Sequence, residues 1–159
     1  LKERLLGDNA AQIIAGAPSH VLIAGWKSQM WRKRILLAAD FATCSGALDI
    51  AAQLARLAGV PITLLAAGDA APETRAADAQ HAADLLRLEN CDCVVRLAAE
   101  ALAPATLHAV QEVGADLVIL FDQRRKAIDQ IAGALDCPVL VVKVGVDLLD
   151  IEAAVAKQA

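Results

Sequence analysis

The stretch that decides the fold is RILLAADFATCSGALDIAAQLARLAGVPITLLAA, residues 34–67. It begins with a strand-like segment at 34–40, continuously apolar from 35 to 39, and ends with a second, mostly apolar segment at 61–67. Between them, residues 45–59 place small and apolar side chains at helical spacing and stop at a glycine, a common helix terminator. A strand with one face in water alternates polar and apolar residues, so these continuous runs predict parallel strands that are buried on both faces.

The same order of strand and helix continues toward the end of the chain. It predicts helices at 72–90 and 104–114, strands at 91–97 and 115–121, and a last helix–strand pair within 128–143. We therefore expect an α/β fold in which a five-stranded parallel sheet carries helices on both faces. A final segment, 147–159, has the pattern of a C-terminal helix.

The beginning of the chain repeats its end. Residues 10–25, AAQIIAGAPSHVLIAG, match residues 128–143, IDQIAGALDCPVLVVK, at an offset of 118 residues that superimposes both Gln-Ile pairs and both apolar runs. Each segment has the pattern of an apolar helix, a short break and a buried strand. Either a helix–strand unit occurs twice, which we prefer, or two unrelated units share these features by chance.

The composition argues against several kinds of partner. The net charge is −4 and the pI is about 5.3, whereas binding to nucleic acid requires clustered Lys and Arg, so we expect no nucleic-acid partner. No apolar run approaches the ~20 residues of a membrane span. The four cysteines and the lack of a secretory leader pattern favour free thiols and a cytoplasmic location.

Three segments together resemble a universal stress protein domain: residues 34–67, VGADLVIL at 113–120 and DCPVLVVK at 136–143. The resemblance implies the fold that this family shares with adenine-nucleotide alpha-hydrolases. Family members often occur as tandem halves that pair through their last strands, running antiparallel. Residues 1–29 then resemble the tail of a preceding half, and residues 30–146 resemble a complete domain.

The family's mode of pairing gives a specific expectation for the repeated segments. We expect residues 20–24 to lie antiparallel beside residues 139–143, either within one chain or across a homodimer. Such pairing would cover a hydrophobic sheet edge that otherwise invites aggregation.

The nucleotide-binding members of this family carry the motif G-x2-G-x9-G-(S/T) after the fourth strand, where glycines let backbone N–H groups approach the phosphates. Here the region reads VILFDQRRKAIDQIAG, residues 118–133. Phe121 stands in place of the first glycine, and Arg125 and Lys126 in place of the closing pair, so about nine residues of the loop are missing. We therefore expect no ATP and no other cofactor.

Four residues remain as candidates for binding a ligand. Asp40 matches the aspartate that the family places near the base and ribose, although an aspartate at this position equally suits a helix cap. Arg124, Arg125 and Lys126 follow a strand and begin a helix, where α/β sheets often bind ligands. These three residues either bind a phosphate or carboxylate through their charges or form a solvated basic turn.

The sequence suggests neither a catalytic residue nor a metal site. Cys44 lies at a predicted helix start, where the helix dipole can lower a thiol pKa, but no histidine is placed to activate it. Cys91 and Cys93 have no partner ligands at metal-binding spacing, and we expect them to pack in the core. We expect Trp26 and Trp31 to anchor the segment that joins the two repeats rather than to bind a ligand.

These observations lead to a functional expectation with alternatives. We expect a non-enzymatic regulatory domain of universal stress protein type, with a degenerate nucleotide site, that acts through dimerisation or contact with another protein. One alternative is a sensor that binds an adenine nucleotide or another anion through Asp40 and residues 124–126. Another is a cytosolic regulatory domain of a membrane transporter.

Overall fold

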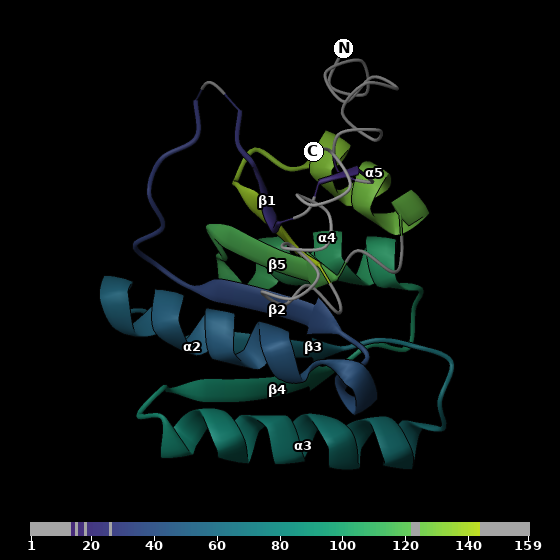
Figure 1. Cartoon of the computed structure of the whole chain (residues 1–159). Coiled ribbons are helices and arrows are strands. Elements are labelled where there is room, and N and C mark those ends of the chain that lie inside the picture. Colours follow the sequence, from purple (N-terminus) through teal and green to yellow (C-terminus); the bar gives the residue numbers. More distant parts are fainter. Residues whose placement is uncertain (1–13, 15, 18, 26, 122–124, 144–159) are drawn as a thin grey trace, which may run out of the picture.

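The computed structural model describes residues 14, 16–17, 19–25, 27–121 and 125–143. These residues form one six-stranded sheet in the order β1-β6-β5-β2-β3-β4 (Figure 1). The strands are β1 (Val21–Ile23), β2 (Ile35–Ala39), β3 (Ile62–Ala66), β4 (Cys93–Leu97), β5 (Leu117–Phe121) and β6 (Val139–Val142). Strands β2 to β6 run parallel to one another, which confirms the expected five-stranded parallel sheet.

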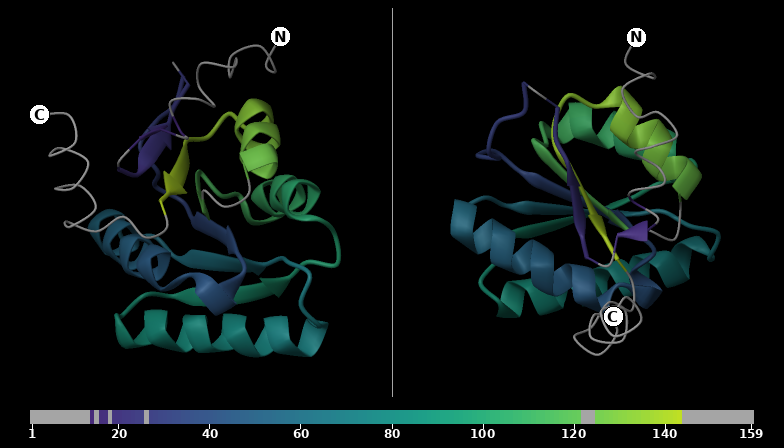
Figure 2. Two further views of the ribbon diagram at one scale, coloured as in Figure 1. Left: turned by 45° about the vertical axis from the view of Figure 1, so that its right-hand side comes forward. Right: turned by 45° about the horizontal axis from the view of Figure 1, so that its top comes forward.

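Helices cover both faces of this sheet, as expected. They are α2 (Ser45–Ala58), α3 (Pro72–Leu88), α4 (Leu102–Val113) and α5 (Arg125–Ala134), with a short 3-10 helix, η2 (Phe41–Thr43), before α2. Helices α2 and α3 lie on one face, and α4 and α5 lie on the other (Figure 2). We call these the α2/α3 face and the α4/α5 face.

Burial explains the continuous apolar runs. All five residues of β2 and all five of β3 are buried, because each strand lies inside the sheet and under helices on both sides. At the sheet edge, β4 is different, since Val94 and Leu97 are about half exposed. Within the described residues, no helix is both long and apolar enough to cross a membrane.

The strand β1 is the sixth member of the sheet and pairs antiparallel with β6. Leu22 lies opposite Leu140, flanked by the pairs Val21–Val141 and Ile23–Val139. The expected pairing of 20–24 with 139–143 is therefore confirmed, and it forms within one chain. The central pair joins residues that are equivalent in the sequence repeat, since Leu22 and Leu140 are 118 positions apart.

Polar contacts of Lys143 strengthen this junction. Its backbone N–H donates to Nδ1 of His20 at 2.9 Å, just before β1 begins. Its buried side chain donates from Nζ to the carbonyl oxygen of Ile14, so the segment before β1 is also joined to the end of β6. The helix expected at 147–159 lies outside the described residues. Of the tail expected at 1–29, the structure describes residues 14, 16–17, 19–25 and 27–29.

Candidate functional site

The residues that the sequence suggests as ligand contacts lie at the end of the sheet where the parallel strands terminate. Asp40 directly follows β2, and α5 begins directly after the β5 connection. Because β2 and β5 are neighbours in the sheet, these two positions share one edge. The structure therefore brings the Asp40 position and the start of α5 to the same end of the molecule.

Asp40 acts as a cap in this structure. Its side chain is the N-cap of η2, and its Oδ1 accepts a hydrogen bond from the backbone N–H of Ala42 at 3.2 Å. The residue is exposed, so its carboxylate is also accessible from solvent. Both interpretations of Asp40, as a cap and as a contact for a ligand, remain compatible with this geometry.

Gly68 stands beside Asp40 just after β3, and the sequence analysis does not single it out. Its φ of 152° is one that side chains rarely adopt, and a methyl group there would lie 3.7 Å from Oδ2 of Asp40. The glycine therefore keeps the space next to the carboxylate open. The signal that could have found it is its position, since it follows the second strand as Asp40 follows the first.

The basic candidates are only partly described. Lys126 is exposed in the first turn of α5, and Arg125 is the first residue of that helix. Arg124 lies outside the described residues. The connection is short: β5 ends at Phe121 and α5 begins at Arg125, so three residues join them.

A small polar cavity lies near this edge on the α4/α5 face. Its volume is about 140 Å³, and its lining includes Arg96, Glu100, His108 and Glu112. Nδ1 of His108 lies 3.1 Å from Glu100, and Arg96 forms an ion pair with Glu112. Arg96 and His108 each already have an acidic partner, so the cavity offers little charge to a ligand.

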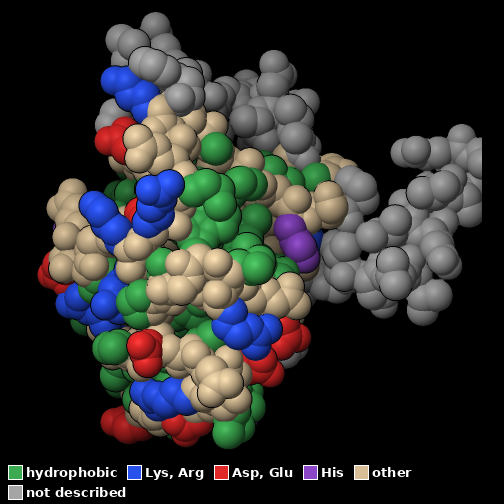
Figure 3. Space-filling view, turned by 90° about the vertical axis from the view of Figure 1, so that its left-hand side faces the viewer, with side chains coloured by type: hydrophobic (Ala, Val, Ile, Leu, Met, Phe, Trp, Pro, Cys, Tyr) green, Lys and Arg blue, Asp and Glu red, His purple; other side chains and the backbone are tan. Residues whose placement is uncertain are grey.

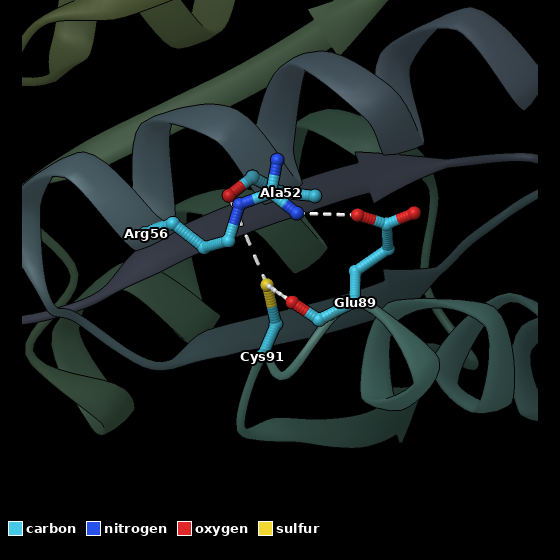
Figure 4. A network of polar contacts seen from close by, with 4 residues as sticks. All are labelled: Ala52, Arg56, Glu89 and Cys91. Carbon is cyan, nitrogen blue, oxygen red and sulfur yellow. Dashed lines mark hydrogen bonds and ion pairs between the residues drawn. The ribbon is translucent and has the colours of Figure 1, made fainter.

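A second, more apolar hollow of about 250 Å³ lies between α2 and α3 and is lined chiefly by leucines. Near it, Arg56 of α2 pairs with Glu89 just after α3 (Figure 4). The Cys91 thiol lies 3.8 Å from the carbonyl oxygens of Ala52 and Glu89 (Figure 4). These contacts join the two helices, and Cys91 serves packing as expected.

The thiols are poorly suited to nucleophilic chemistry. Burial, reinforced by the carboxylate of Asp40, raises the pKa of Cys44 to about 12, and its Sγ donates to the carbonyl of Phe41. The helix start therefore does not lower this pKa, in contrast to the possibility raised by the sequence. Burial also raises the pKa of Cys93 and of Cys137 to about 11. All four cysteines are free.

Two further expectations concern metals and tryptophans. Among the described residues, no group of three or more His, Cys, Asp or Glu side chains is arranged to hold a metal ion. Trp31 packs against the core on the α2/α3 face, as an anchoring role requires. Trp26 lies outside the described residues.

Comparison with known proteins gives structural matches only. No protein-family model and no curated protein matches this sequence. A universal stress protein from Archaeoglobus fulgidus DSM 4304 superimposes with a TM-score of 0.74 at 19% identity, over 89% of this chain and 56% of that one. A functionally unknown protein from Pseudomonas aeruginosa PAO1 superimposes with a TM-score of 0.67 at 17% identity, over 99% of this chain and 63% of that one.

Shorter proteins match over a smaller share of this chain and over nearly all of their own length. A universal stress protein in complex with cAMP gives a TM-score of 0.63 at 20% identity, covering 71% of this chain and 98% of that one. By contrast, the chain spans little more than half of the Archaeoglobus protein first described. At these identities the likeness establishes the fold.

Proposed function

This chain has the fold of the universal stress proteins, and on that premise we propose that it is a non-enzymatic regulatory domain with a degenerate nucleotide site. It acts by contact with another protein or another copy of the same sheet. We place it in the cytoplasm, where its four free cysteines remain reduced.

The observation that carries this proposal is the short connection between β5 and α5. Three residues, 122–124, join Phe121 to Arg125. In nucleotide-binding members the last glycine of the motif lies 13 positions after the first, against the 4 positions from Phe121 to Arg125, and that longer loop surrounds the phosphates with backbone N–H groups. A connection of three residues supplies too few N–H groups to enclose a polyphosphate.

The pairing of β1 with β6 supports the role in association. The pair is symmetric about Leu22 and Leu140, which are equivalent in the repeated sequence. Two copies of the same strand related by a twofold axis would give this register. We infer that residues before β1 belong to a preceding half-domain, and that sheet-to-sheet contact is how this protein associates.

A thermal-shift experiment with Mg-ATP, ADP and cAMP tests the loss of the nucleotide site. A ligand that binds only the folded state at about 100 times its Kd stabilises the protein by ~2.7 kcal/mol, which is a shift of several degrees. We expect no change in midpoint with any of the three at millimolar concentration. A shift of several degrees with ATP would contradict the degenerate site.

A second function, sensing a small anionic nucleotide, is favoured by one observation. Gly68 leaves space beside the accessible carboxylate of Asp40, and one structural neighbour was solved with cAMP, whose single phosphate needs no long cradle. In the same experiment, a shift with cAMP alone would support this function. It should then disappear in Lys126→Ala and in Asp40→Asn, which retains the oxygen that caps η2.

A further inference from the structure

The hollow between α2 and α3 connects the buried core to apolar side chains at the surface. Leu48 and Ala52 of α2 and Leu86 of α3 line its inner part and are buried. Leu85 and Leu88 of α3 line its outer part and are 42% and 81% exposed. Because these exposed leucines adjoin a hollow, they differ from the single exposed leucines that are normal on a protein surface.

The volume of the hollow suits one side chain rather than a small-molecule ligand. It is about 250 Å³, whereas small-molecule pockets have volumes of about 300–1,000 Å³. Contacts between proteins gain much of their binding energy from a few large side chains that fill such hollows on the partner. We therefore consider a segment of a protein as the occupant.

The spacing of the lining residues gives the hollow a direction. Leu48 and Ala52 are four positions apart on α2, and Leu85 and Leu88 are three positions apart on α3, so each helix contributes neighbours along its own axis. A groove between two helices is of the kind that receives the apolar face of an amphipathic helix.

The charges that line the hollow are acidic. Asp49 and Glu89 line it, and none of its lining residues is Lys or Arg. Glu89 is already paired with Arg56 (Figure 4), whereas Asp49 is exposed and forms no ion pair with any residue that the structure describes. Figure 3 faces the end of the molecule where α2 and α3 finish, and acidic and basic side chains lie among hydrophobic ones in its lower part. A cation of the partner beside the hollow would complement Asp49.

The same charges disfavour a second copy of this chain as the occupant. A twofold contact brings the same surface of both subunits together, so the two Asp49 carboxylates would share one interface. Helices α2 and α3 contain three arginines and no lysine. Arg56 and Arg87 are engaged in ion pairs, and Arg75 donates to backbone carbonyls. The cation must therefore come from a different protein.

We propose that the hollow between α2 and α3 binds a basic amphipathic helix of another protein. One apolar side chain of that helix enters among Leu48, Leu85 and Leu88, and a Lys or Arg beside it pairs with Asp49. The proposal rests on the function proposed above, since it supplies a surface for contact with another protein. Strand β1 lies at the opposite edge of the sheet from β4 and α3, so the two contacts do not compete.

A titration of the full chain with a synthetic peptide tests this site. The probe is a helical peptide of about 15 residues with leucines on one face and lysines on the other, which spans about 22 Å. In methyl NMR we expect the largest shifts at Leu48, Leu85 and Leu88, with saturation below about 1 mM peptide. The same peptide with glutamates in place of lysines should bind about tenfold more weakly. No binding, equal binding of the two peptides, or largest shifts at Leu22 and Leu140 would overturn the proposal.

Variants at exposed positions separate the hollow from general attraction between an acidic protein and a basic peptide. Leu88→Ala should weaken binding about tenfold, whereas Leu57→Ala, which truncates a leucine that is 85% exposed outside the lining, should leave it unchanged. Asp49→Asn should weaken binding about threefold and reduce its dependence on salt. Glu73→Gln, an exposed carboxylate of α3 outside the lining, is the matched control for charge. Equal effects within either pair would overturn the proposal.

The peptide and nucleotide experiments have separate outcomes. A peptide that does not bind, together with an unchanged midpoint in ATP, removes this surface and leaves the degenerate nucleotide site in place. A midpoint raised by ATP contradicts the degenerate site, whereas the difference between Leu88→Ala and Leu57→Ala in peptide binding still decides whether the hollow is the docking site.

Discussion

The carboxylate of Asp116, just before β5, holds the end of the segment that joins β1 to β2. It accepts hydrogen bonds from the backbone N–H groups of Arg32, Lys33 and Arg34 at 2.7, 3.0 and 2.9 Å. The sequence shows only an aspartate before a strand, and its partners lie more than 80 residues away. Such a contact depends on which strands become neighbours, so local pattern could not predict it.

Replacement of Asp116 should be among the costlier single changes near the surface. Asp116→Ala removes the carboxylate that accepts hydrogen bonds from three backbone N–H groups. Some of these N–H groups can then bind water, so we expect the free energy of unfolding to fall by about 1–3 kcal/mol. Urea denaturation measures it. Asp129→Ala, at an exposed position of α5, is the control and should change stability by less than about 0.5 kcal/mol.

The Cys44 thiol makes stability depend on pH in the alkaline range. Its pKa rises from the ordinary 9.0 to about 12 on folding, so the folded state holds the proton more tightly than the unfolded chain does. Stability is therefore retained below pH 9 and falls as pH rises from about 9 toward 12, by up to about 1.4 kcal/mol per pH unit for this group.

Cys44→Ala tests this dependence. In urea titrations between about pH 8 and 11, the variant should lose stability less steeply than the unsubstituted protein, whatever its stability at pH 8. Cys93 and Cys137 should account for part of the slope that remains, because their pKa values are also raised. Equal slopes for the two proteins would contradict the assignment to Cys44.

At the scale of elements, helix ends and strand burial follow from local chemistry. Helix α2 ends at Gly59, whose φ of 67° is left-handed and whose N–H donates to the carbonyl of Ala55. The predicted end at residue 59 was therefore accurate. The sequence predicts a helix at 104–114, whereas α4 begins at Leu102 and includes Pro104 within its first turn, where a proline is tolerated.

Gly46 within α2 and Gly59 at its C-cap should respond in opposite directions to alanine. Gly59→Ala forces a side chain into the left-handed region and should cost about 1 kcal/mol. Gly46→Ala lies within the helix with nothing within 4 Å of the added methyl, so it should stabilise by about 0.5–1 kcal/mol. Thermal denaturation of both variants checks the signs, and a stabilising Gly59→Ala would contradict this account.

The junction of β1 with β6 depends on a contact that can be removed by itself. His20→Ala takes away the acceptor of the Lys143 N–H, and we expect a loss of about 1 kcal/mol together with faster hydrogen exchange at that amide. His81→Ala, exposed on α3, is the control. Unchanged exchange at Lys143 would show that the junction does not rely on His20.

At the scale of the whole molecule, alternating elements sufficed to predict a parallel sheet, while the resemblance to a family was needed to predict the pairing of 20–24 with 139–143. The sequence also located Asp40 and the short connection after Phe121. It did not reveal Gly68 beside Asp40, because that proximity arises when β2 and β3 become neighbours. The raised pKa of Cys44 was missed for a similar reason, since burial is a property of the assembled core.

The contact between β1 and β6 closes a loop of more than a hundred residues, between Ile23 and Val139. Closing a flexible loop of that length costs about 4 kcal/mol in chain entropy, and β1 contributes only three residues in return. In kinetic terms, β1 should be the last strand to dock and the first to detach. During such openings the vacant β6 can accept β1 from a neighbouring molecule in the same register, so concentrated solutions favour strand-swapped species.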